Sequence, residues 1–136
     1  MNESLLKAYQ LALYRLKGAG IEFEMRVGER SQDLKELLNQ HQVETWAFVT
    51  AANPQSQVLT EQENIRRNQE LEKLLIKDGY VYFTGESCSA DGGWPVEVSF
   101  LILGISETEA LRLASQFQQK AILFGGSSGI PLLKFL

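Results

Sequence analysis

The strongest constraint on the fold is a buried-strand signal followed closely by a capped helix. Trp46–Val49 is an unbroken run of apolar residues with high β propensity, which is typical of a strand covered on both faces. Asn53 and Pro54 then end the strand, because proline lacks a backbone donor and restricts the residue before it. Thr60 and Glu63 form a capping box, in which each side chain serves the backbone N–H of the other. This pair predicts the start of a long helix.

The same kinds of signal repeat toward the carboxyl end. Residues 80–84 and 98–103 predict a second and a third strand, and residues 121–124 predict a fourth. Between the last two, Ser106 and Glu109 form a second capping box and predict a second helix. The order strand, helix, strand, strand, helix, strand is that of the ferredoxin-like split βαβ unit. We therefore predict an α+β fold with a βαββαβ antiparallel sheet and both helices on one face. A helix-plus-sheet domain of another topology is the alternative.

Residues 1–44 are predicted to be an amino-terminal addition to this core. Apolar residues recur at helical spacing through residues 3–17, and residues 21–27 alternate as in a half-exposed strand. Ser31 is placed to cap a short helix that follows. The expectation is therefore a helix, a strand and a short helix before the core.

No repeat or proline-rich linker divides the chain, so the 136 residues are expected to form one domain. Residues 45–136 would be its core, and residues 132–136 are expected to add an edge strand. An exposed edge of this kind can pair with another strand. The sequence leaves open whether the chain is a monomer or a homodimer.

Charge and composition exclude several classes of function. The net charge is -4, so general nucleic-acid binding is not expected, because no excess of cations is present to replace phosphate counterions. No apolar segment approaches the roughly 20 residues of a membrane-spanning helix. Cys88 is the single cysteine, which excludes an intramolecular disulfide. The amino terminus has no signal-peptide pattern, so the expected location is cytoplasmic. No cofactor and no metal is expected.

The predicted topology brings separate polar segments to one end of the sheet. The loop at Asn53, the turn at residues 91–97 and the end of the second helix near Gln119 would all meet there. We call this end the rim. The residues predicted to bind a ligand at the rim are Asn53, Ser56, Glu63, Asn64, Arg67, Trp94, Glu97 and Gln119.

Arg67 is the most unusual member of this set. Stepping back along the apolar stripe of the first capped helix reaches Arg67 and Asn64, which predicts an inward-facing guanidinium. Such a group is costly unless partners satisfy its donors. Two interpretations stay open: Arg67 bridges Glu63 and Glu97 to tie a loop down, or these groups form a binding site.

Three blocks of the sequence resemble a bacterial family catalogued as domain of unknown function 3293. The segments that carry the resemblance are residues 46–56, 63–68, 93–97, 99–101, 104–106 and 117–121, so it covers roughly residues 45–124. The family usually has an aromatic residue where Ala52 stands and a glycine where Gln118 stands. The resemblance implies kinship and a candidate site, and it implies no reaction.

The leading functional hypothesis is a domain that binds a small polar or anionic molecule at the rim formed by Asn53, Arg67 and Trp94. One alternative is an interaction or regulatory module that pairs through the carboxyl-terminal edge strand. Another is a hydrolase with Glu63 or Glu97 as general base.

Overall fold

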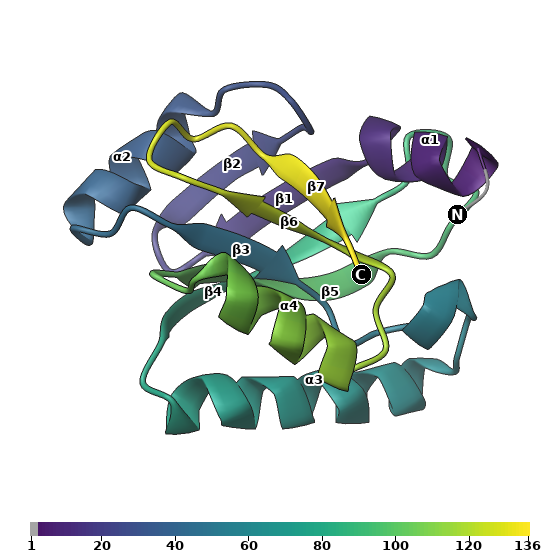
Figure 1. The fold of residues 1–136 in the computed structure, drawn as a ribbon. Coiled ribbons are helices and arrows are strands. Elements are labelled where there is room, and N and C mark those ends of the chain that lie inside the picture. The colour runs from purple at the N-terminus through teal and green to yellow at the C-terminus, as the bar shows by residue number, and fades with distance from the viewer. Residues whose placement is uncertain (1–2) are drawn as a thin grey trace.

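The computed structural model describes residues 3–136, which form one sheet of seven strands with helices on both of its faces (Figure 1). In chain order the elements are α1 (Glu3–Leu11), β1 (Leu13–Gly18), β2 (Ile21–Met25), α2 (Gln32–Gln40), β3 (Trp46–Val49), the 3-10 turn η1 (Pro54–Ser56), α3 (Glu61–Lys77), β4 (Val81–Cys88), β5 (Glu97–Leu103), α4 (Glu107–Gln116), β6 (Ala121–Gly125) and β7 (Leu132–Phe135). The strand order is β2-β1-β4-β5-β3-β6-β7, and every neighbouring pair is antiparallel. The α+β class is therefore confirmed. Among residues 3–136, no helix has both the length and the apolar character of a membrane span.

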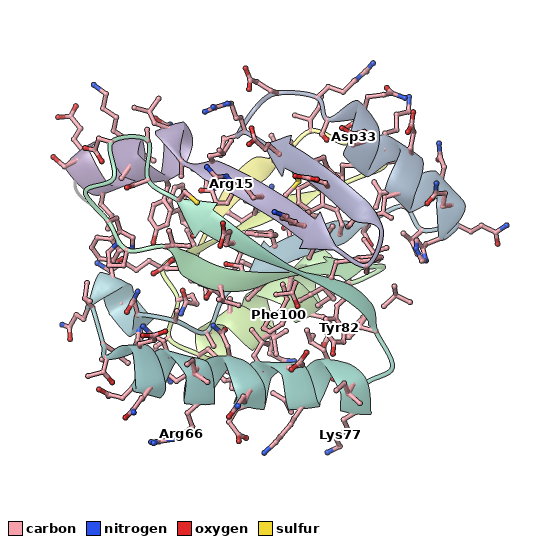
Figure 2. The ribbon with its side chains drawn as sticks, turned by 180° about the vertical axis from the view of Figure 1, so that it is seen from behind. Arg15, Asp33, Arg66, Lys77, Tyr82 and Phe100 are labelled. Atoms are coloured by element: carbon pink, nitrogen blue, oxygen red, sulfur yellow. The ribbon has the colours of Figure 1, made fainter. Side chains whose placement is uncertain are left out.

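The centre of the sheet is the predicted pair of strands. β3 lies between β5 and β6, and Trp46 faces Leu103 on one side and Gly125 on the other. Both capped helices pack on one face of these strands, as expected. There Leu71 and Leu75 of α3 belong to the same buried cluster as β3 and β5 residues. Figure 2 shows Tyr82 and Phe100 between the sheet and α3, with their rings edge to face.

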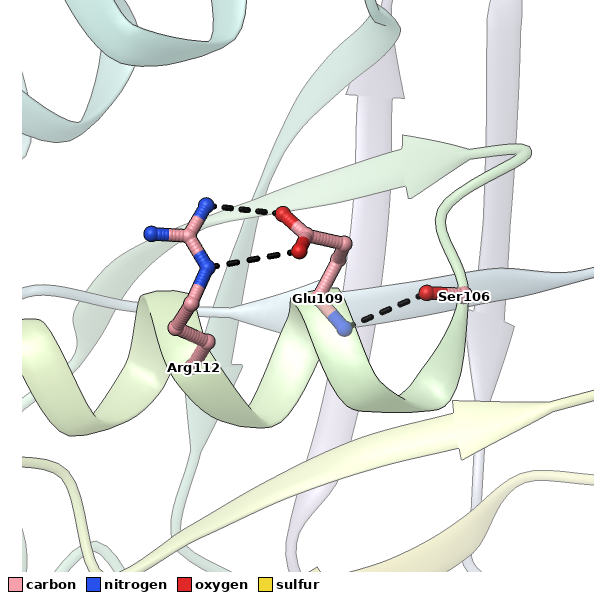
Figure 3. Close-up of polar contacts among 3 residues, drawn as sticks. All are labelled: Ser106, Glu109 and Arg112. Carbon is pink, nitrogen blue, oxygen red and sulfur yellow. Dashed lines mark hydrogen bonds and ion pairs between the residues drawn. The ribbon is translucent and has the colours of Figure 1, made fainter.

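The first predicted capping box is complete, whereas the second is only half formed. Thr60 Oγ1 accepts a hydrogen bond from Glu63 N at 3.2 Å, and Glu63 Oε1 accepts one in return from Thr60 N at 3.4 Å. Ser106 Oγ likewise accepts from Glu109 N, at 3.2 Å. The Glu109 carboxylate instead binds Arg112, with 2.7 Å between Oε2 and Nη2 (Figure 3). A guanidinium one turn away is a stronger partner for a carboxylate than a backbone N–H.

The helix predicted over residues 3–17 is wrong in its second half, whereas the strand and the short helix predicted after it are present. The helix ends at Leu11 and the chain continues as β1, which pairs with both β2 and β4. Ala12, Tyr14 and Leu16 are buried, and the intervening side chains are more exposed. This alternation has the period of a strand, and pairing with the edge of β4 overrides the helical spacing. The addition is thus a helix, a hairpin and a second helix, and the edge strand β7 is present as predicted.

The two capped helices, α3 and α4, share one face of the sheet as predicted. Two further helices cover the second face. In Figure 1, α1 and α2 lie on the opposite side of the sheet from α3 and α4. Leu34, Leu37 and Leu38 of α2 fill a core cluster together with Trp46 and other strand residues of this face. α1 lies at the other end of the same face. The two helices thus divide this face between a filled core and the site described next.

Candidate functional site

A pocket of about 120 Å³ lies beneath α1 on the face opposite α3. The sheet curls around it, so Tyr14 on β1 and Leu133 on β7 both reach its wall although their strands are far apart in the sheet. The remaining apolar wall includes Leu5 and Ala8 of α1 and Phe48 of β3. Its polar side chains are those of Tyr9, Tyr14, Thr50, Asn53, Ser56, Ser87, Ser89, Trp94, Glu97, Ser99 and Gln119. An engineered apolar cavity of about 150 Å³ holds benzene, so this somewhat smaller pocket of about 120 Å³ has room for a molecule of only a few heavy atoms.

Glu97 supplies the only carboxylate among the described residues of the pocket wall. Its Oε2 accepts hydrogen bonds from Asn53 Nδ2 at 2.7 Å and from Trp94 Nε1 at 3.1 Å. Burial raises the pKa of Glu97 above its ordinary value, and hydrogen bonds from Asn53, Trp94 and Ser87 offset part of that rise. No lysine, arginine or histidine lies on the described part of the wall. The carboxylate is therefore oriented by neutral donors and has no cationic partner in the pocket.

Asn53 holds the loop that carries this site. Its Oδ1 accepts from Leu59 N at 2.9 Å and from Asn64 Nδ2 at 2.8 Å, and its own N donates to Asn64 Oδ1 at 2.9 Å. Its φ is 48°, and Gln55 and Ser56 also have left-handed backbone. Non-glycine residues adopt this conformation rarely, and such strain persists only where the surroundings fix it. The asparagine therefore determines both the loop conformation and the orientation of Glu97.

Two tyrosines, Tyr9 and Tyr14, close the pocket, and neither is among the residues predicted from the sequence. Tyr14 Oη donates to the backbone oxygen of Tyr9 at 2.9 Å, and Tyr9 Oη lies 3.4 Å from Ser56 Oγ. Burial raises the pKa of each phenol, and the negative charge of Glu97 raises it further. The alternation of Ala12, Tyr14 and Leu16 indicates a strand that would turn Tyr14 inward. This signal is lost when residues 3–17 are assigned to one continuous helix.

Arg67 lies outside the pocket, and the expected ion pairs with Glu63 and Glu97 are wrong. Its Nε donates to Ala51 O at 2.6 Å, and its Nη2 donates to Phe117 O and, at 2.9 Å, to the side-chain oxygen of Gln118. Glu63 is engaged in the α3 cap, and Glu97 points to the other face of the sheet. Arg67 therefore joins the loop after β3 to the end of α4 through neutral oxygens.

The expected convergence of the rim segments is confirmed by their hydrogen bonds, but they do not form one site. Of the eight predicted residues, the pocket wall includes Asn53, Ser56, Trp94, Glu97 and Gln119, and it does not include Glu63, Asn64 and Arg67. Gln119 is buried and donates to Ala52 O at 3.0 Å, so it supports the wall behind Asn53. The rim thus divides into a pocket on one face and a set of hydrogen bonds on the other. We call this second set, from Arg67 to Ala51, Phe117 and Gln118, the joint.

A family model described as Protein of unknown function (DUF3293) matches residues 49–122, which is more than half of the chain. The chain belongs to this family. No curated protein and no solved structure matches it. The matched segment contains Asn53, Trp94, Glu97 and Gln119, whereas Tyr9 and Tyr14 precede it.

A glycine at position 118, expected from the family resemblance, would have a structural reason. Gln118 has a φ of 54°, a conformation that glycine adopts without steric cost. Its backbone oxygen accepts from Gln55 N at 2.7 Å, and its side-chain oxygen accepts from Arg67. The side chain that replaces glycine here adds a contact to the joint. Ala52 is buried and does not line the pocket.

Proposed function

We propose that this protein binds one small polar molecule in the pocket beneath α1, with Glu97 as the principal contact. The observation that carries the proposal is a carboxylate oriented by two N–H donors in a pocket of organic-molecule size. Pockets of this kind combine apolar walls with a few convergent polar groups, and a perturbed carboxyl pKa adds to the support.

Of the two ligand classes expected from the sequence, the polar one has the better support. An anionic ligand would rely on Arg67, and that guanidinium is bonded to carbonyl and amide oxygens away from the pocket. In the pocket the ligand would meet the Glu97 carboxylate instead, and like charges repel strongly at low dielectric.

We propose further that residues 45–125 form a ferredoxin-like split βαβ core in a single cytoplasmic domain. The order β4-β5-β3-β6 and the antiparallel pairing of these strands support the topology. The site would then lie on the sheet face that α3 and α4 leave open. The unpaired thiol of Cys88 fits a reducing compartment.

A thermal-shift screen of small polar compounds tests the binding proposal. A ligand at 100 times its Kd should stabilise the fold by about 2.7 kcal/mol, which raises Tm by several degrees. Glu97→Gln should lose most of this response, and Glu61→Gln, an exposed carboxylate of the first turn of α3, should keep it. The proposal fails if Glu97→Gln responds to every stabilising compound as the parent does, or if no compound stabilises the parent.

Pairing of two copies through β7 is the second candidate function. β7 is an edge strand on which Leu132 and Phe135 are about half exposed, whereas the other edge, β2, carries exposed Glu22 and Glu24. Charged residues protect an edge from pairing, and apolar ones do not. We expect a homodimer in solution that Phe135→Lys converts to monomer. A parent mass of one chain at all measured concentrations would exclude it.

A further inference from the structure

The described wall of the pocket carries one acidic side chain and no basic one. Glu97 is the one carboxylic acid of the described wall, and the other polar groups there are hydroxyls, amides, one indole and one thiol. Burial raises the pKa of the Cys88 thiol, which keeps that group neutral. Arg15 of β1 forms ion pairs with Glu24 and Glu86, and none of these three residues lines the pocket. Within residues 3–136 no side chain on the wall neutralises the carboxylate.

Four aromatic residues of the described wall line the same pocket as Glu97. Tyr9, Tyr14, Phe48 and Trp94 all line the pocket, and the indole of Trp94 is fixed by its hydrogen bond to Glu97. Tyr14 and Phe48 are packed edge to face, with 5.7 Å between ring centroids. The face of an aromatic ring attracts cations, and clusters of such rings bind methylated ammonium groups. A carboxylate in the same pocket adds Coulomb attraction for the same cation.

We propose that the ligand of this pocket is a compact organic cation, with a primary or methylated ammonium group placed between Glu97 and the aromatic rings. This inference rests on the proposed binding function and specifies its ligand class. An ammonium group neutralises a carboxylate whose burial is otherwise costly. A neutral ligand leaves that cost in place, and an anion adds repulsion to it.

Two other cationic occupants fit less well. A divalent metal ion requires several oxygen or nitrogen ligands of suitable type, and the described residues contain no group of three acidic, histidine or cysteine side chains placed to hold one. An extended polyamine exceeds the volume of about 120 Å³. A single ammonium with a few carbons matches both the charge and the space.

Titration calorimetry with matched probes tests this proposal. Choline is compared with its neutral carbon isostere 3,3-dimethylbutan-1-ol, and butylammonium is compared with butan-1-ol and butyrate. We expect an ammonium probe to bind at least about tenfold more tightly than its neutral partner, and butyrate not to bind, because a buried opposite charge favours the cation. The shift of the Trp94 indole N–H in NMR spectra should report the same binding.

Three variants locate the effect. Glu97→Gln should weaken ammonium binding at least about tenfold and leave alcohol binding within about threefold, because it removes charge while preserving shape. Tyr9→Leu should weaken ammonium binding by a few fold, because it removes one ring from a helix that contributes no buried residue to the core. Glu61→Gln, outside the pocket, should bind all probes as the parent does.

Each contrary outcome has a distinct meaning. If the neutral alcohols bind as tightly as the ammonium probes, the cation proposal is overturned, and the binding proposal stands only if Glu97→Gln weakens that binding. The same conclusion follows if only non-cationic compounds from the thermal-shift screen bind in a Glu97-dependent way. If neither the probes nor any screened compound shifts the Trp94 indole N–H, both proposals fail. Should Glu97→Gln not fold, Tyr9→Leu with the isostere pairs still decides the question.

Discussion

The helices on the two faces of the sheet differ in how much they bury. α3 is 17 residues long, has a complete capping box and buries Leu71 and Leu75 to 1% exposure or less. α1 is 9 residues long and none of its residues is buried. The described side chains of α3 close a core, whereas those of α1 cover a pocket. In the function proposed above, α3 would thus serve stability and α1 would serve binding.

The difference has a physical basis in helix formation. Isolated helices shorter than about 12 residues are marginal in water, so tertiary contacts must hold α1 in place. The polar contacts of Tyr9 with Tyr14 and Ser56 are two of these. Elements with few buried contacts open locally at low free energy, and binding sites are commonly formed by such elements.

The largest effect that tests this comparison is expected from Leu71→Ala. Loss of this buried side chain should lower the free energy of unfolding by about 2–5 kcal/mol, because a cavity remains in a close-packed core. Leu5→Ala in α1 should lower it by about 1 kcal/mol or less, because Leu5 is only half buried at the pocket wall. Urea denaturation measures both. Equal losses would show that α1 stabilises the fold as strongly as α3.

A smaller loss of stability is expected from Arg67→Met, which tests whether Arg67 has a structural role apart from the pocket. Arg67→Met should lower the free energy of unfolding by about 2–3 kcal/mol, because Ala51 O and Phe117 O lose a charged donor. The loss comes from unpaired carbonyl oxygens and not from a stranded carboxylate. Removal of Glu63 or Glu97 should therefore not restore it.

Arg66→Met is the matched control for this joint. Arg66 is exposed on the neighbouring position of α3 (Figure 2), so its substitution should change stability by less than about 0.5 kcal/mol. Parent-like ligand binding in Arg67→Met would agree with a structural role. Loss of ligand binding with only a modest loss of stability would show that Arg67 contributes to the binding site.

The smallest expected effect is a pH dependence of stability whose direction is set by the raised pKa of Glu97. Burial raises the pKa of Glu97, so the folded protein retains a proton that the unfolded chain releases near the ordinary value of 4.5. The free energy of unfolding of the parent, relative to Glu97→Gln, should therefore fall as pH rises from 4.5 through the folded pKa. Denaturation at a series of pH values measures this difference.

Glu109→Gln is the control in the same experiment, because the contribution of Glu109 to stability should change with pH in the opposite direction. Arg112 lowers the pKa of Glu109 through a hydrogen bond and its charge, so the stabilisation from Glu109 is present above the unfolded pKa and is lost as pH falls through the folded one. A flat or rising difference for Glu97→Gln would contradict the burial of its carboxylate in the pocket.

Part of the candidate site could be predicted from the sequence because local signals position it. The Asn53-Pro54 break and the Thr60 cap place a loop beside the third strand signal, and Glu97 opens that strand. Convergence of these segments follows from element order alone. The face to which each side chain points does not follow from element order. Adjacent residues of a strand face opposite sides, and β5 is apolar on both sides, so its pattern does not distinguish the two faces.

Arg67 illustrates the limit of local pairing rules. The spacing of Glu63 and Arg67 favours an ion pair on an isolated helix. In the folded chain the carboxylate serves the cap, and the guanidinium meets carbonyl oxygens that arrive from residues 51 and 117. Such partners are far apart in sequence, so no local pattern contains them.

The sequence by itself determined the α+β class, the central strands and the helices capped by Thr60 and Ser106, since periodicity and caps act within a few residues. Only the tertiary structure decided that residues 13–18 form a strand, because the open edge of β4 supplies hydrogen bonds that a helix would forgo. It also decided that Tyr9, Tyr14 and Glu97 share one pocket, since the curl of the sheet brings distant strands together.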